Sequence, residues 1–102
     1  MKVYDKLVRD MIPEIIEASG SKCEVEVVND EVALEYLYKK LGEEVEELLS
    51  DKNLDEIADV MEVLFAIGKK YGYSDDEVLG RRNEKRDARG GFDDNLVLKR
   101  TY

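Results

Sequence analysis

The sequence predicts a mainly α-helical fold, an antiparallel four-helix bundle-type arrangement with a small β element. Charged residues make up 40% of the chain and hydrophobic residues 43%. That charged share is well above the usual ~25% and is typical of long amphipathic helices with one solvated face. Two apolar stripes at helical spacing, joined by a short polar connection, indicate an antiparallel helix pair. At 102 residues, we expect residues 1–102 to form a single domain with one modest core.

The N-terminal third predicts a short helix followed by a short strand. Pro13, the only proline, fits the first turn of a helix that Gly20 ends. Residues 23–28 alternate in polarity and are rich in β-branched side chains. This pattern predicts a strand.

The middle of the chain predicts two long helices. Asn29 or Asp30 caps the first, which runs to about Ser50, and the second runs to about Gly72. Only residues 51–53 connect them, so the helices are expected to be antiparallel neighbours. The expected apolar stripes are Leu34, Leu37, Tyr38, Leu41, Val45, Leu48 and Leu49 on the first, and Ile57, Val60, Met61, Leu64, Ile67 and Gly68 on the second.

The C-terminal third predicts a fourth helix and a terminal strand. Ser74, with Glu77 three residues later, forms a capping box that opens a helix through about Arg89. Gly90-Gly91 ends this helix. Residues 95–100 are apolar enough for a strand that pairs with residues 23–28, and this pair is the predicted β element.

The composition excludes several classes of function. The net charge is −9, which argues against binding to nucleic acid or to an anionic membrane, because both require a positive field. The chain has no histidine and one cysteine, Cys23, so histidine-based catalysis, Ser-His triads, intrachain disulfides and the usual zinc sites are excluded. The N-terminus carries no apolar signal segment, and we expect a cytoplasmic protein.

Acidic residues gather in two motifs on the central helices. Residues 43–47 read E-E-x-x-E and residues 56–59 read E-x-x-D, so each motif places carboxylates on one helix face. Like charges so placed repel, and a hard divalent cation such as Mg²⁺ is the simplest compensation. At about 100° per residue, four carboxylates border one side of the two stripes: Glu44, Glu47, Glu56 and Asp59. Glu43 is marginal by this measure, and Glu46 and Glu62 lie on other faces.

Basic residues gather in residues 81–89, which hold five of the 16 Lys and Arg. Their side chains suit phosphate oxygens, and Gly90-Gly91 permits close backbone approach to a ligand. Lys6 and Arg9 are a weaker version of the same pattern. Periodicity leaves an ordinary alternative open for each cluster. The acidic motifs could form a solvated helix face. The basic residues could be favourable charges at the C-terminus of a helix that Gly90-Gly91 ends.

Together these motifs resemble the MazG-like all-α nucleoside triphosphate pyrophosphohydrolases. E-E-x-x-E and then E-x-x-D on consecutive helices, followed by a Lys/Arg segment, carry the resemblance. Residues 4–13 (YDKLVRDMIP) and 85–92 (KRDARGGF) are similar to the small house-cleaning branch, also described as phosphoribosyl-ATP pyrophosphohydrolase-like. The resemblance covers nearly the whole chain. One departure is that only eight residues separate Glu47 from Glu56, fewer than this family usually shows.

The resemblance implies Mg²⁺-dependent cleavage of a nucleoside triphosphate between its α- and β-phosphates, with Mn²⁺ as an alternative ion and a homodimer or homotetramer as the assembly. It implies that Glu43, Glu44, Glu47, Glu56 and Asp59 are metal ligands, that Glu44 and Glu56 also act in catalysis, and that Lys85, Arg89, Asn83, Lys6 and Arg9 bind substrate phosphates. Two other functions stay open: hydrolysis of phosphoribosyl-ATP, and a non-catalytic helical regulatory or interaction module.

Overall fold

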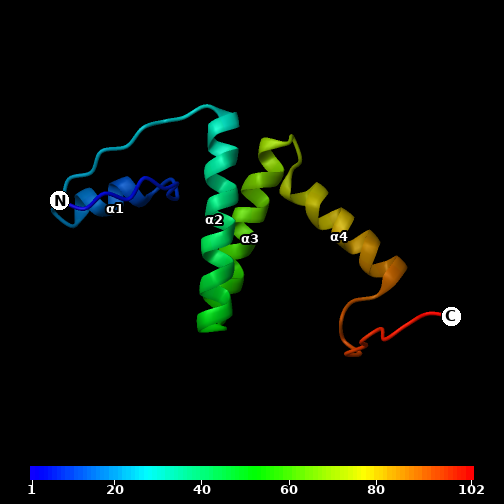
Figure 1. Ribbon diagram of the computed structural model, residues 1–102. Coiled ribbons are helices and arrows are strands. Elements are labelled where there is room, and N and C mark those ends of the chain that lie inside the picture. Colours follow the sequence, from blue (N-terminus) through cyan, green and yellow to red (C-terminus); the bar gives the residue numbers. More distant parts are fainter.

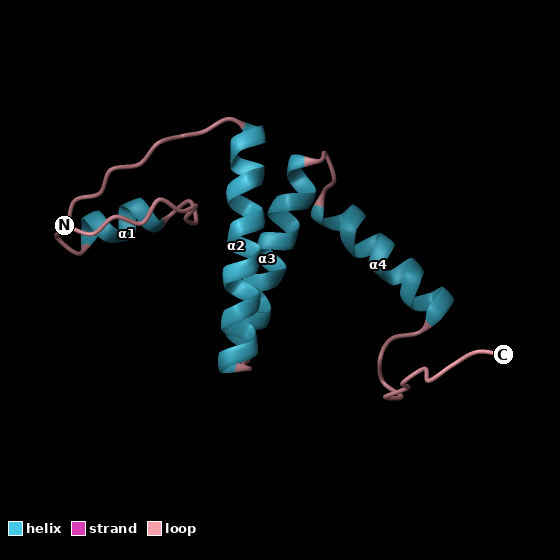
Figure 2. Ribbon diagram, in the orientation of Figure 1, coloured by secondary structure: helices cyan, strands magenta, loops and turns pink.

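The structure, a computed structural model, describes all 102 residues and contains four α-helices and no β-strand (Figure 2). The helices are α1 (Ile12–Ala18), α2 (Asp30–Asp51), α3 (Leu54–Lys70) and α4 (Asp75–Arg89). In Figure 1, α2 and α3 lie side by side as an antiparallel hairpin, with α1 and α4 on opposite sides of it. The mainly α-helical class is therefore confirmed. None of these helices combines the length and the apolar character that crossing a membrane requires.

Local capping explains where the hairpin begins and turns. The Asn29 side chain accepts a hydrogen bond from the Val32 N–H at 2.9 Å, and Asn53 accepts one from the Glu56 N–H at 3.0 Å. Each bond satisfies a backbone N–H in the first turn of its helix that has no partner within the helix. Between the helices, Lys52 takes a left-handed conformation with φ of 51°, which reverses the chain within two residues. The predicted ends of both helices differ from the observed ends by one or two residues.

The capping box at the start of α4 is confirmed. The Ser74 hydroxyl accepts from the Glu77 N–H at 3.1 Å, and the Glu77 carboxylate accepts from the Ser74 N–H at 3.3 Å. Two open donors are satisfied reciprocally. This end of α4 is also where it meets α3, since Gly68 lies against Val78. From there α4 leads away from the hairpin (Figure 1).

The hydrophobic core is small and lies between α2 and α3. Leu37, Val63 and Ile67 are buried there, and four partly buried side chains pack around them: Leu7, Leu34, Leu41 and Ala66. Leu7 comes from the N-terminal segment, which ties that segment to the hairpin. Val63 was not in the predicted stripe. In contrast, six stripe residues are exposed: Tyr38, Val45, Leu49, Ile57, Met61 and Leu64.

The predicted β element is not formed. Residues 23–28 and 95–100 carry no strand, and they lie in the cyan and red segments at opposite sides of the molecule (Figure 1). A strand without a partner leaves its backbone groups unpaired, so each segment stays irregular. The prediction failed because polarity alternation indicates a local preference and does not supply a partner.

A closed four-helix bundle is also not formed within one chain. The seven-residue α1 has no buried residue and contacts no other helix. The charged helix α4 contacts α3 alone. Neither end helix therefore closes the bundle around the hairpin. The four-helix count holds, whereas the bundle does not.

The chain exposes more surface than a compact protein of its mass. Its accessible surface is 9244 Å², against about 5,900 Å² expected for a folded 11.7 kDa monomer. Its radius of gyration is 17.8 Å, against about 13 Å for a compact domain of this length. About 3,300 Å² of surface per chain is therefore in excess.

Candidate metal centre

Four carboxylates converge between the two central helices. Glu44 and Glu47 on α2, with Glu56 and Asp59 on α3, each offer an oxygen, and these oxygens all lie within 4.8 Å of one another. Spacing of three residues places each pair on one helix face, and the short turn at residues 52–53 holds the two faces opposite each other. We call these side chains the four-carboxylate group. Helical phase had grouped the same residues.

Two oxygens of the four-carboxylate group are buried without a hydrogen-bond partner: Oε2 of Glu44 and Oε2 of Glu56. Glu44 is only 8% exposed, and its other oxygen lies 3.5 Å from Nζ of Lys40. A buried charged acceptor without a partner is destabilising, so a bound cation would relieve a cost that the fold itself creates.

The electrostatics of the group follow from this crowding. Burial, and next the neighbouring carboxylate of Glu47, raise the pKa of Glu44, while Lys40 partly opposes them. Burial, followed by Glu47 and Asp59, also raises the pKa of Glu56. Both carboxyls therefore hold a proton more tightly in the folded chain than in the unfolded chain.

We expect the metal-free protein to lose stability as the pH rises. Below the ordinary value of 4.5 both carboxyls are protonated in either state. As the pH climbs through the raised pKa, the folded state is forced to release protons that it binds more tightly, and the free energy of unfolding falls. Thermal unfolding with a chelator, from about pH 4 to about pH 8, measures this. Glu44→Gln should flatten the profile, and identical profiles for both proteins would contradict the assignment.

The donor set suits a hard divalent cation. It consists of carboxylate oxygens alone, with no thiol or imidazole, and such sites favour Mg²⁺ or Mn²⁺ over zinc or copper. Glu43, predicted as a fifth ligand, is not part of the group. Its carboxylate instead lies 3.8 Å from Nζ of Lys40. Helical periodicity also puts Glu43 at the margin of the side on which the four carboxylates lie.

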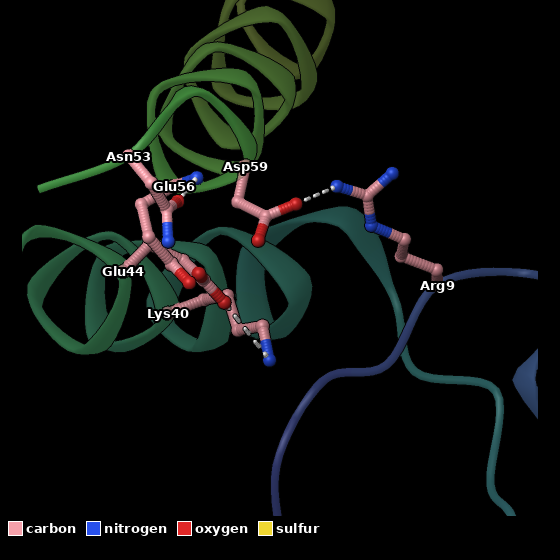
Figure 3. A network of polar contacts seen from close by, with 6 residues as sticks. All are labelled: Arg9, Lys40, Glu44, Asn53, Glu56 and Asp59. Atoms are coloured by element: carbon pink, nitrogen blue, oxygen red, sulfur yellow. Dashed lines mark hydrogen bonds and ion pairs between the residues drawn. The ribbon is translucent and has the colours of Figure 1, made fainter. Parts of the chain in front are cut away.

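Arg9 is the basic residue that contacts the four-carboxylate group from the N-terminal segment. Its Nη2 lies 2.7 Å from Oδ1 of Asp59, and Figure 3 shows the guanidinium approaching Asp59 from the side away from Glu44 and Glu56. Lys6, three residues earlier, lines a small cavity beside α2. Both residues of this N-terminal pair therefore lie near the hairpin.

The predicted phosphate ligands on α4 are not brought to the four-carboxylate group within one chain. Asn83, Lys85 and Arg89 are exposed and make no ion pair with the hairpin. Their neighbours form local pairs instead, Arg81 with Glu84 at 2.8 Å and Arg86 with Asp93 at 3.3 Å. The reason is the direction of α4, which diverges from α3 after its first turns (Figure 1).

Sequence reasoning missed two lysines that the structure places near this centre, Lys39 and Lys40. Lys40 precedes Glu44 by four residues, a spacing that puts the two side chains together on a helix. The four-residue spacing could therefore have indicated Lys40. Nothing local indicated Lys39, because the cavity that it lines is closed by the N-terminal segment.

Comparison with protein-family models, with curated proteins and with solved structures gave no match to this chain. The resemblance to the MazG-like enzymes therefore rests on the motifs given above.

Proposed function

We propose that this protein is a Mg²⁺-dependent nucleoside triphosphate pyrophosphohydrolase, which converts a triphosphate to a monophosphate and pyrophosphate and removes nonstandard nucleotides. The observation that carries the proposal is the four-carboxylate group, with its unpartnered oxygens on Glu44 and Glu56. The resemblance of the motifs to the MazG-like enzymes supports the reaction class.

The resemblance suggests a role for each of the four carboxylates. Glu44, Glu47 and Asp59 would hold the ion, and Glu56 would act as a further ligand or as the base. A bound Mg²⁺ supplies charge neutralisation at phosphate oxygens and makes water a better nucleophile. With no histidine in the chain, a carboxylate must orient or deprotonate the attacking water, and we assign this role to Glu56.

The acidic character of the chain also affects which form of the substrate binds. A net charge of −9 repels a bare triphosphate, so we expect the Mg²⁺ complex to be the species that binds. Arg9 is exposed and pairs with Asp59. Since an exposed ion pair contributes little stability, its guanidinium is free to exchange this carboxylate for a phosphate oxygen.

Pyrophosphate release from a panel of standard and modified nucleotides, with phosphoribosyl-ATP included, tests the proposal. We expect release that requires Mg²⁺ or Mn²⁺ and yields the monophosphate. Release from phosphoribosyl-ATP alone would reassign the substrate. No metal-dependent release from any member of the panel would contradict the enzyme and favour a non-catalytic interaction module.

We also propose that the chain works as a homodimer or homotetramer. The excess surface of about 3,300 Å² per chain is on the scale of an obligate interface, which buries about 1,000–2,500 Å² on each partner. An apolar groove of about 330 Å³ between α3 and α4 offers a place for it, lined by Met61, Leu64, Phe65, Val78, Leu79 and Arg82. A second copy of the same chain supplies matching apolar surface.

We expect Met61→Asp to dissociate the assembly, because it places a charge in the apolar groove. Sedimentation equilibrium over a range of concentrations measures the molar mass. The exposed neighbour Glu62, changed to Gln, is the matched control and should leave the assembly intact. A wild-type protein that stays monomeric at every concentration would contradict this proposal.

A further inference from the structure

A small cavity lies beside the four-carboxylate group, between the N-terminal segment and α2. It measures about 80 Å³, and its polar lining comes from Asp5 and Lys6 on the segment and from Tyr36, Lys39, Lys40 and Glu43 on α2. We call it the lysine cavity. Three lysines thus line one concave site of a chain whose net charge is −9.

Three contacts place the N-terminal segment beside the hairpin. The Tyr36 hydroxyl donates to the Asp5 carboxylate at 3.0 Å. Leu7 packs against the core of the hairpin. Arg9 pairs with Asp59 on α3 at 2.7 Å. The segment therefore lies along the hairpin and forms the outer wall of the cavity.

The ammonium groups of Lys6 and Lys39 have no carboxylate partner. Nζ of Lys6 lies 5.9 Å from the centre of the Tyr4 ring, and Nζ of Lys39 lies 5.5 Å from the centre of the Tyr36 ring. No ion pair engages either lysine. Both acids of the lining are already engaged, Asp5 by the Tyr36 hydroxyl and Glu43 by Lys40. Two donors are thus left for an oxyanion.

Size and position define which oxyanion fits. The cavity volume of about 80 Å³ is enough for several waters, since one water needs about 10–15 Å³ of such space. A site of this size admits a phosphoryl group. Lys40 connects the cavity to the four-carboxylate group, because it lines the cavity and its Nζ lies 3.5 Å from Oε1 of Glu44.

We propose that the lysine cavity binds the terminal phosphoryl group of the substrate, and therefore also one end of the pyrophosphate product. The ligand class is a condensed phosphate held by Lys6 and Lys39, with Lys40 joining this cavity to the four-carboxylate group. This assignment rests on the proposed function for the identity of the nucleotide, and on the cavity for the phosphate. It replaces the basic residues of α4, which the same chain does not bring to this place.

Calorimetric titration of the full chain with inorganic pyrophosphate, in the presence of Mg²⁺, tests the assignment. We expect Lys6→Gln and Lys39→Gln each to weaken binding about tenfold, since each removes a charge-assisted hydrogen bond. Lys6→Arg should retain most of the affinity. Lys22→Gln, a change at an exposed lysine remote from the cavity, is the matched control and should bind as the wild type does. Unchanged pyrophosphate affinity in the Lys6→Gln/Lys39→Gln double variant would overturn the assignment.

The same variants separate this inference from the proposed function. Pyrophosphate binding that depends on Lys6 and Lys39, without hydrolysis of any nucleotide, would support the cavity and contradict the enzyme. Suppose instead that a nucleotide is hydrolysed, and that neither its KM nor the pyrophosphate affinity changes when both lysines are replaced. This result would support the proposed enzyme activity and overturn the assignment of the lysine cavity. Circular dichroism of the double variant should match the wild type, because both side chains lie at the surface.

Discussion

Glu44→Gln is expected to abolish activity and at the same time to stabilise the metal-free protein. Glu44 is the most buried member of the four-carboxylate group, with one oxygen unpartnered. Glutamine keeps the shape, removes the charge that repels Glu47, and adds a donor for a neighbouring carboxylate. We expect a gain of about 1 kcal/mol in the metal-free free energy of unfolding. This corresponds to about 4–8 °C in Tm for a domain of this size.

The loss of activity has the same origin. Changing an outer-shell partner typically costs 10–100-fold in metal affinity or activity, so removal of a direct ligand should lower kcat/KM at least about 100-fold. Mg²⁺ should raise the Tm of the wild type and leave that of the variant nearly unchanged. Glu46→Gln, an exposed change on the same helix, is the matched control and should alter none of these quantities. A variant that is less stable than the wild type without metal, or that keeps full activity, would contradict the role given to Glu44.

Leu37→Ala is expected to cause the largest loss of stability. Leu37 is 4% exposed and lies at the centre of the core, against Val63 and Ile67. Truncation leaves a cavity that few neighbours can refill, and such changes cost about 2–5 kcal/mol. Small domains have only about 5–15 kcal/mol in total, so the Tm should fall by about 10 °C or more.

Chemical denaturation of the metal-free protein measures this loss directly. Leu96→Ala is the matched control, because Leu96 is 88% exposed in the C-terminal segment, and it should change the free energy of unfolding by less than about 0.5 kcal/mol. Equal effects of the two changes would show that the buried cluster between α2 and α3 is not the core of the fold.

The features that the sequence predicts well depend on neighbours in the chain. The start of α4 follows from Ser74 and Glu77, which satisfy each other within one turn. The starts of α2 and α3 follow from the side chains of Asn29 and Asn53, which cap them. The four-carboxylate group was also within reach, because it needs only two helical phases and a turn short enough to make the helices antiparallel.

The features that the sequence does not predict depend on tertiary partners. Residues 23–28 have the alternation of a strand but no second strand beside them. Val63 lies off the expected stripe, yet the packing of α3 against α2 buries it. Lys39 lines the lysine cavity only because the N-terminal segment, with Leu7 packed on the core, lies against its helix. No local pattern encodes that contact.

Calorimetric titration with Mn²⁺ tests the central claim, that the four carboxylates form one metal centre. We predict saturable binding to the wild type and to Glu46→Gln. Glu44→Gln and Asp59→Asn should each weaken it by at least about tenfold, because each removes a ligand from the group. Absence of saturable binding to the wild type, or equal affinity in all four proteins, would contradict the claim.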